Sequence, residues 1–319
     1  MRKIEINSTI DGYVSEYYTE LESSGIIAKI KKELDDLILD VKDCKNKKYE
    51  NYLNEIRNNL QNIITLHPSA FQPLINKLSS YGCCLTMKRW KSKSKLTFAG
   101  RITEALQYKY IRKNIFPKYI KKLGIKTCVY CNTQYAITTE DEDGVISAYY
   151  ELDHAWPKAL YPFLAISFLN LHPCCGPCNK RKSDTGKPYS IYVEKATEST
   201  VQFRIEDESL VNYHLYHKED DLKISIFVGD KDLDSLYDRI GVRKLYLNLT
   251  EEAVEMVWRS IIYNKSFMNQ LMTTYKDVFR DYKIDKYRLL CGFYSEVENV
   301  YFRPLTKMKQ DIARQLNIL

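Results

Sequence analysis

The chain has 319 residues, of which 45% are hydrophobic and 28% are charged, and its formal net charge is +7. This composition is typical of a soluble globular protein, and no apolar run is long enough to cross a bilayer, so we expect no membrane segment. The first residues, MRKIEINSTIDGY, lack the apolar run of a secretory signal. We therefore predict a cytoplasmic protein whose nine cysteines are reduced, several of them bound to metal.

The first third of the chain has the pattern of a helical region. Apolar residues recur at helical spacing in residues 26–43, and a second such stripe runs from about Tyr49 to Thr65. Residues 69–80 predict a third, shorter helix with a bend near Pro73. A further helix is expected over residues 103–123, interrupted at Pro117. Such stripes indicate core packing and assign no function.

Two basic segments follow these helices. KRWKSKSK spans residues 88–95, and residues 101–126 contain eight Lys or Arg and one Glu. A charge run is usually a solvated helix face, but a basic face beside a functional site also suits a polyanion, since phosphate neutralisation supplies most non-specific affinity. Both interpretations stay open at this point.

The middle of the chain changes character. Residues 132–139 and 145–154 are rich in β-branched and aromatic residues and flank the turn-forming run EDEDG, which predicts a β-hairpin whose second strand ends at Asp153 and His154. CNKRKSD then opens a short helix. Beyond it, residues 199–207 and 222–229 indicate strands, and residues 249–282 and 305–319 indicate helices. We expect a helical region over residues 1–124, a motif-bearing core over 125–190 and a mixed, mainly helical region over 191–319.

Two Cys-x-x-Cys pairs, with 43 residues between them, form the strongest motif of the chain. The four sulfurs belong to Cys128, Cys131, Cys175 and Cys178. One such pair would leave a redox pair or free thiols open, but two pairs in one segment favour a closed, structural Zn²⁺ site. Cys174 is a rival ligand, and the matching two-residue spacing favours Cys175.

Between the cysteine pairs lies a second group of polar residues. Asp153 and His154 are adjacent, Asn170 follows sixteen residues after His154, and Asn179 comes directly after Cys178. Asp and Asn offer the hard oxygen ligands that Mg²⁺ or Mn²⁺ prefers, and a histidine near neutrality can act as a general base. Phosphodiester hydrolysis needs both a base and a cation. Arg181 and Lys182, on the short helix that carries Asn179, are predicted to contact nucleic acid.

The pattern CVYCN…LDHAWPK…YPFLAISFLNLHPCCGPCNKRK resembles the HNH endonucleases, whose core is the ββα-metal fold. The resemblance covers about residues 125–190. It implies that Asp153 and Asn179 bind the catalytic cation, that His154 is the general base and that Asn170 orients His154. It also implies DNA as the substrate and a zinc held by the four cysteines.

A finer resemblance links the chain to the HNH subunits of bacterial anti-phage defence in the Septu and retron-associated group. There the nuclease works with an ATPase of the ABC/SMC-like type, which implies an ATPase partner here. The helical N-terminal part is longer than that group leads us to expect, and it is an interaction, DNA-binding or regulatory module.

The sequence thus predicts an α+β protein in which mainly helical flanks surround a ββα-metal (HNH) nuclease core with a four-cysteine zinc knuckle. The predicted activity is metal-dependent DNA cleavage in anti-phage defence. The alternative is a zinc-dependent nucleic-acid-binding or scaffold module without catalysis, which has the same cysteines and basic segments.

Overall fold

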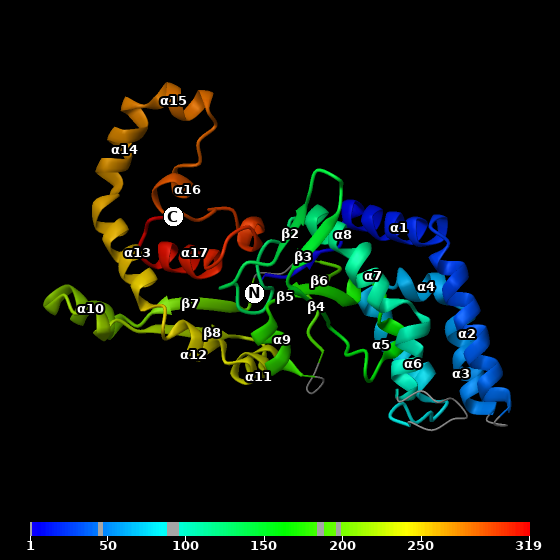
Figure 1. Cartoon of the computed structure of the whole chain (residues 1–319). Helices are drawn as coiled ribbons and strands as arrows, with labels where there is room; N and C mark the ends of the chain where they lie inside the picture. Colours follow the sequence, from blue (N-terminus) through cyan, green and yellow to red (C-terminus); the bar gives the residue numbers. More distant parts are fainter. Residues whose placement is uncertain (1, 44–46, 88–95, 184–187, 196–198) are drawn as a thin grey trace.

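The computed structural model describes residues 2–43, 47–87, 96–183, 188–195 and 199–319. Helices predominate in this part of the chain, and its strands form four two-stranded sheets (Figure 1). A contiguous hydrophobic core runs through all three predicted regions. None of the described helices combines the length and the apolar character needed to span a membrane. The basic segment KRWKSKSK lies outside the described residues.

The N-terminal part is helical, as predicted. Its elements are β1 (Ile4–Glu5), α1 (Ser8–Ser23), α2 (Ile26–Asp43), α3 (Lys47–Asn58), α4 (Leu60–Ile64), η1 (Pro68–Ala70), α5 (Phe71–Ser79), α6 (Phe98–Ala105), α7 (Tyr108–Asn114) and α8 (Phe116–Lys122). The apolar stripe of α2 is confirmed, whereas the helix expected from Tyr49 to Thr65 is divided at Asn59 between α3 and α4.

The prolines of this part lie at helix starts rather than inside helices. Pro73 lies in the first turn of α5, and Pro117 in the first turn of α8, where backbone N–H groups have no partner within the helix. The predicted helix over residues 103–123 is therefore three helices. The first break falls at Gln107, which has a left-handed φ of 55°.

The middle part contains β2 (Ile137–Glu140), β3 (Ile146–Tyr149), β4 (Glu151–His154), η2 (Pro162–Leu164), η3 (Phe168–Asn170), β5 (Leu171–Cys174) and α9 (Gly176–Lys182). The hairpin of β2 and β3 is confirmed, with Gly144 at a φ of 77° in its turn. The prediction that its second strand continues to Asp153 and His154 is wrong. The strand ends at Tyr149, and the Asp-His doublet lies on β4, which pairs antiparallel with β5.

The reason for this break is a change in burial. The side chains of β3 are mainly exposed, whereas Leu152, Asp153 and His154 of β4 are buried. The chain therefore leaves an exposed sheet and joins a buried one at Tyr150. Both segments are rich in residues that favour strands, so their composition does not reveal the change.

The C-terminal part holds the predicted strand pair and a run of helices. Its elements are β6 (Tyr192–Val193), β7 (Val201–Ile205), α10 (Asp207–Tyr216), η4 (Glu219–Asp221), β8 (Ile224–Val228), α11 (Lys231–Ile240), α12 (Val242–Tyr246), α13 (Thr250–Ile262), α14 (Lys265–Thr274), α15 (Lys276–Asp281), α16 (Lys286–Leu290), η5 (Val297–Tyr301) and α17 (Thr306–Gln315). The strands β7 and β8 pair antiparallel, and β1 pairs with β6 in parallel. The helix expected over residues 249–282 is divided into α13, α14 and α15.

Both flanks are bonded to the middle part. On one side the Tyr17 hydroxyl donates to the Ile166 carbonyl at 3.1 Å, and the Tyr108 hydroxyl donates to the Leu152 carbonyl at 3.3 Å. On the other side the Tyr246 hydroxyl donates to the Cys131 carbonyl at 2.7 Å. The segment with the cysteines and the Asp-His doublet is therefore held between helices from both ends of the chain (Figure 1).

Candidate active site and cysteine cluster

The strands β4 and β5 and the helix α9 carry the predicted site residues. In the register of β4 and β5, Asp153 lies opposite His172 and His154 lies opposite Leu171. The helix α9 begins two residues after β5 and packs on β4. An antiparallel hairpin followed by a helix therefore positions the doublet beside Asn179.

Asp153 lies at the centre of a buried hydrogen-bond network. Its Oδ2 accepts a hydrogen bond from the Tyr130 hydroxyl and one from Lys182 Nζ at 2.8 Å, and His172 Nε2 is 3.5 Å away. Burial raises the pKa of Asp153, but the contact with His172 and the charge of Lys182 outweigh it and hold that pKa well below its usual range. The carboxylate is therefore ionised, as a cation ligand must be.

His172 supports this arrangement from a fully buried position. Its Nε2 lies 2.7 Å from the Tyr130 hydroxyl. Because that hydroxyl gives its proton to Asp153, it accepts from Nε2, and His172 is the tautomer with hydrogen on Nε2. Burial lowers the pKa of His172, which keeps the ring neutral. The sequence did not place Tyr130 in the site. Its only signal was its position between two cysteines of one Cys-x-x-Cys pair.

His154 is held in one orientation. Its Nε2 lies 3.0 Å from the Ala165 carbonyl, which can only accept, so Nε2 carries the hydrogen and Nδ1 keeps its lone pair. The ring also packs on Tyr108, with the ring centroids 4.9 Å apart. Burial and then the nearby charge of Lys158 lower the pKa of His154 to about 3, so the ring is neutral. A neutral imidazole with a free nitrogen can accept a proton.

Asn170 acts on the loop that holds His154. It is fully buried, its Oδ1 accepts from the Trp156 N–H at 2.7 Å, and its Nδ2 donates to the carbonyls of Trp156 at 3.1 Å and Leu164 at 2.9 Å. Leu164 precedes Ala165, the partner of His154. Any influence of Asn170 on the His154 ring therefore passes through this backbone.

Asn179 lines the same pocket as the doublet. The pocket has a volume of about 250 Å³ and is lined by Leu152, Asp153, His154, Pro157, Lys158, Asn179, Lys180 and Ser183. The Asn179 Nδ2 donates to the Glu151 carboxylate, which leaves its Oδ1 as the free end of the amide. Asp153 bonds through Oδ2. In the described part of the chain, neither Asp153 Oδ1 nor Asn179 Oδ1 has a hydrogen-bond donor, and hard oxygens of this kind are the protein ligands that Mg²⁺ or Mn²⁺ prefers.

The two predicted nucleic-acid contacts differ in exposure. Arg181 is exposed and donates to the Ile240 carbonyl at 3.2 Å. Lys182 is only 4% exposed, and its Nζ bonds to Asp153 and, at 2.7 Å, to the His154 carbonyl. The short helix turns Lys182 toward β4, and its contact with nucleic acid stays a prediction. Lys158 and Lys180 instead supply the positive charge of the pocket.

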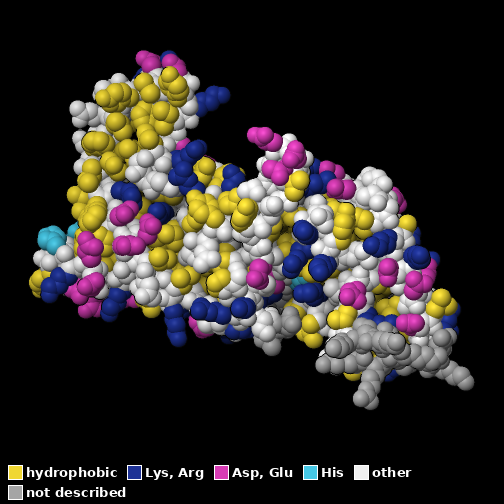
Figure 2. Space-filling view, in the orientation of Figure 1, with side chains coloured by type: hydrophobic (Ala, Val, Ile, Leu, Met, Phe, Trp, Pro, Cys, Tyr) yellow, Lys and Arg dark blue, Asp and Glu magenta, His cyan; other side chains and the backbone are white. Residues whose placement is uncertain are grey.

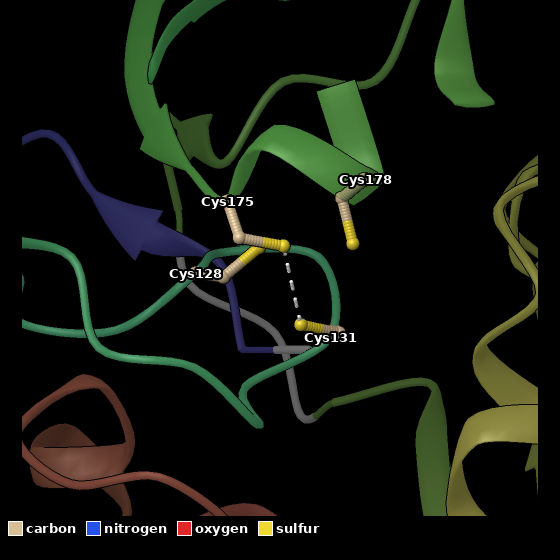
Figure 3. A group of neighbouring side chains, drawn as sticks. All are labelled: Cys128, Cys131, Cys175 and Cys178. Atoms are coloured by element: carbon tan, nitrogen blue, oxygen red, sulfur yellow. Dashed lines mark hydrogen bonds between the residues drawn. The ribbon is translucent and has the colours of Figure 1, made fainter. Parts of the chain in front are cut away.

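The four predicted cysteines form one buried cluster. The sulfurs of Cys128, Cys131, Cys175 and Cys178 all lie within 4.8 Å of one another and point to a common centre (Figure 3). The Cys131 and Cys175 sulfurs are 3.9 Å apart. A tetrahedral zinc with Zn–S bonds of about 2.3 Å places its sulfurs about 3.8 Å apart, so the cluster fits such an ion. The four cysteines can bind a metal such as zinc.

Cys174, the rival ligand, lies outside the cluster. It is buried, and its thiol donates to the Glu151 carbonyl at 3.6 Å. Burial raises the pKa of this thiol well above its usual range, so it stays protonated. The preference for Cys175 over Cys174 is confirmed by the position of the sulfurs.

The cysteine cluster and the pocket share structural parts. The helix α9 carries both Cys178 and Asn179, and the turn between Cys128 and Cys131 carries Tyr130, which bonds to Asp153. A metal that fixes this turn and the start of α9 therefore also fixes the carboxylate and the amide at the pocket.

Comparison with known proteins gives one informative match. The chain is 33% identical over 141 residues to a Septu protein PtuB from Bacillus thuringiensis, which is 43% of this chain and 49% of that protein. The chain thus spans about half the length of this curated relative. No protein-family model matches the sequence, and no solved structure matches it. The chain is therefore similar, over less than half of its length, to a Septu-type protein.

Proposed function

We propose that this protein is a metal-dependent HNH endonuclease that hydrolyses DNA phosphodiester bonds in a bacterial anti-phage defence system. The observation that carries the proposal is the pocket in which Asp153, His154 and Asn179 converge, with Nδ1 of His154 unprotonated. The order of β4, β5 and α9 supports a ββα-metal core. The similarity to the Septu protein supports the defence role.

The polar residues in and behind the pocket have distinct roles in this reaction. The Nδ1 of His154 accepts a proton from the attacking water, while the Ala165 carbonyl holds the ring in place. Asn170 positions that loop. Lys158 and Lys180 lie where they can bind the phosphate.

Asp153 and Asn179 would hold Mg²⁺ or Mn²⁺ through their free oxygens. When bound, such a cation offsets negative charge on the phosphate and on the leaving oxygen. Lys182 neutralises the other oxygen of Asp153, and the Tyr130 hydroxyl fixes the rotation of the carboxylate. The zinc site has a structural role, because all four of its ligands are cysteines.

The nuclease is proposed to act with an ATPase partner, as the resemblance to the Septu and retron-associated group implies. Such a partner would bring the nuclease to its substrate or release its activity. We therefore expect the free chain to be less active than the complex.

The test is conversion of supercoiled plasmid to nicked or linear DNA. The purified protein, with its zinc retained, is incubated with and without Mn²⁺, alone and with the proposed ATPase partner. We expect Mn²⁺-dependent cleavage in at least the complex. If plasmid is bound but uncut in all four reactions, the protein is the non-catalytic binding module instead.

A further inference from the structure

A basic groove leads along α7 to the candidate active site. A pocket of about 540 Å³ is lined by Lys109, Arg112 and Lys113 of α7 on one side, and by residues 146–148 and 150–152 on the other. It shares Leu152 with the pocket that contains Asp153 and His154. The two hollows therefore adjoin along β4.

The groove continues away from the site. A third pocket, of about 410 Å³, shares Lys109 and Lys113 with the previous one and includes Tyr110, which is 51% exposed. The three pockets follow one another along this path. Lys109 and Lys113 of α7 line both the outermost pocket and the middle one. A path of this kind suits an extended ligand better than a small compact one.

The cations of the groove are available to a ligand. Lys109, Arg112 and Lys113 lie three and four residues apart, so they share one face of α7, and all three are exposed. In the described part of the chain no acidic residue forms an ion pair with any of them. The groove contains two carboxylates, Glu104 and Glu151, and Asn179 donates a hydrogen bond to Glu151.

The charge of the groove matches that of the pocket at its end. Lys158 and Lys180 line that pocket, so five cations follow one path from α7 to His154. Lys and Arg side chains gather on the surface where α7 and β4 lie side by side (Figure 2). Phosphates of a nucleic-acid backbone are the polyanion that such a row of cations binds.

We propose that the α7 groove, defined by Lys109, Arg112 and Lys113, binds the DNA backbone and directs it to His154. This rests on the proposed nuclease function for its choice of DNA. It assigns a substrate-binding role to the part of the N-terminal helical region nearest the site. It also distinguishes these three residues from other basic residues of the chain, whose charges lie off this path.

The experiment measures DNA binding without cleavage. All proteins carry His154→Ala, and the affinity for a short fluorescein-labelled duplex is measured by anisotropy over a range of salt concentrations. The groove variant is Lys109→Ala/Arg112→Ala/Lys113→Ala. The matched control is Lys29→Ala/Lys31→Ala/Lys32→Ala, which removes the same charge from exposed positions of α2. Equal thermal midpoints verify that both variants are folded.

The groove variant is expected to bind the duplex at least about tenfold more weakly than the parent. The magnitude of the slope of log affinity against log salt is expected to fall by about three. The control should change affinity less than about twofold. Equal weakening by the two variants, no weakening by either, or preferential binding of a matching RNA duplex would overturn the proposal. Cleavage by the parent chain is scored separately. If the groove variant loses DNA affinity but the parent chain never cuts DNA, the nuclease function is refuted and the DNA-binding role of the α7 groove is retained.

Discussion

The Cys175→Ala protein is expected to lose its zinc and much of its stability, whereas the Cys174→Ala protein keeps both. The two cysteines are adjacent and both buried, but only Cys175 belongs to the sulfur cluster. A structural zinc contributes about 10–16 kcal/mol in isolated zinc-finger peptides, while whole domains are stable by only about 5–15 kcal/mol. Here the C-terminal flank also holds the cysteine turn through Tyr246, so we expect a loss of about 5 kcal/mol or more rather than complete unfolding.

The measurement combines zinc content per chain with urea unfolding. Cys174→Ala removes one buried sulfur that binds no metal, and it should cost about 1–2 kcal/mol with zinc at one per chain. If Cys175→Ala retained one zinc per chain, the four-cysteine assignment would be wrong. If Cys174→Ala lost it instead, Cys174 would be the ligand.

His154→Ala is expected to reduce cleavage by about 10²–10⁴-fold, the usual contribution of a general base. The substitution removes Nδ1, the free nitrogen of the pocket, but leaves the four cysteines untouched. Zinc content should therefore stay at one per chain. Because the ring also packs on Tyr108 and bonds to Ala165, the rate must be compared at equal folded fraction.

The control for this substitution is His214→Ala. His214 is exposed on α10, far along the chain from the pocket, so its loss should leave cleavage within about twofold. The assignment of His154 fails if His154→Ala, folded and loaded with zinc, cuts DNA as fast as the parent.

The cysteine cluster was predictable because two short spacings fix its chemistry. Each Cys-x-x-Cys turn brings two sulfurs together locally, and only one tertiary contact is needed to join them. The helix α2 was predictable for a similar reason, since its apolar residues repeat regularly. By contrast α1 escaped prediction, because Gly12 and its β-branched and aromatic residues have low helix propensity.

The network around Asp153 was not predictable from the sequence. It joins Tyr130, His172 and Lys182, which lie on a turn, a strand and a helix that meet only in the fold. The burial of Lys182 was not predictable either, because a helix of two turns gives no periodicity from which its buried face can be read. The strand break at Tyr150 was not predictable, because neither Gly nor Pro marks it in the sequence.

The central claim is that Asp153 and Asn179 together hold a divalent cation beside His154. It is tested most directly by titrating the zinc-loaded protein with Mn²⁺ and following free Mn²⁺ by electron paramagnetic resonance. Asn179→Ala is the main variant, because Asn179 is only half-buried and its loss should not unfold the protein; Asp153→Asn is the second. We predict one Mn²⁺ per parent chain and affinity at least about tenfold weaker in each variant, with zinc unchanged. Undiminished Mn²⁺ binding in both variants would contradict the claim.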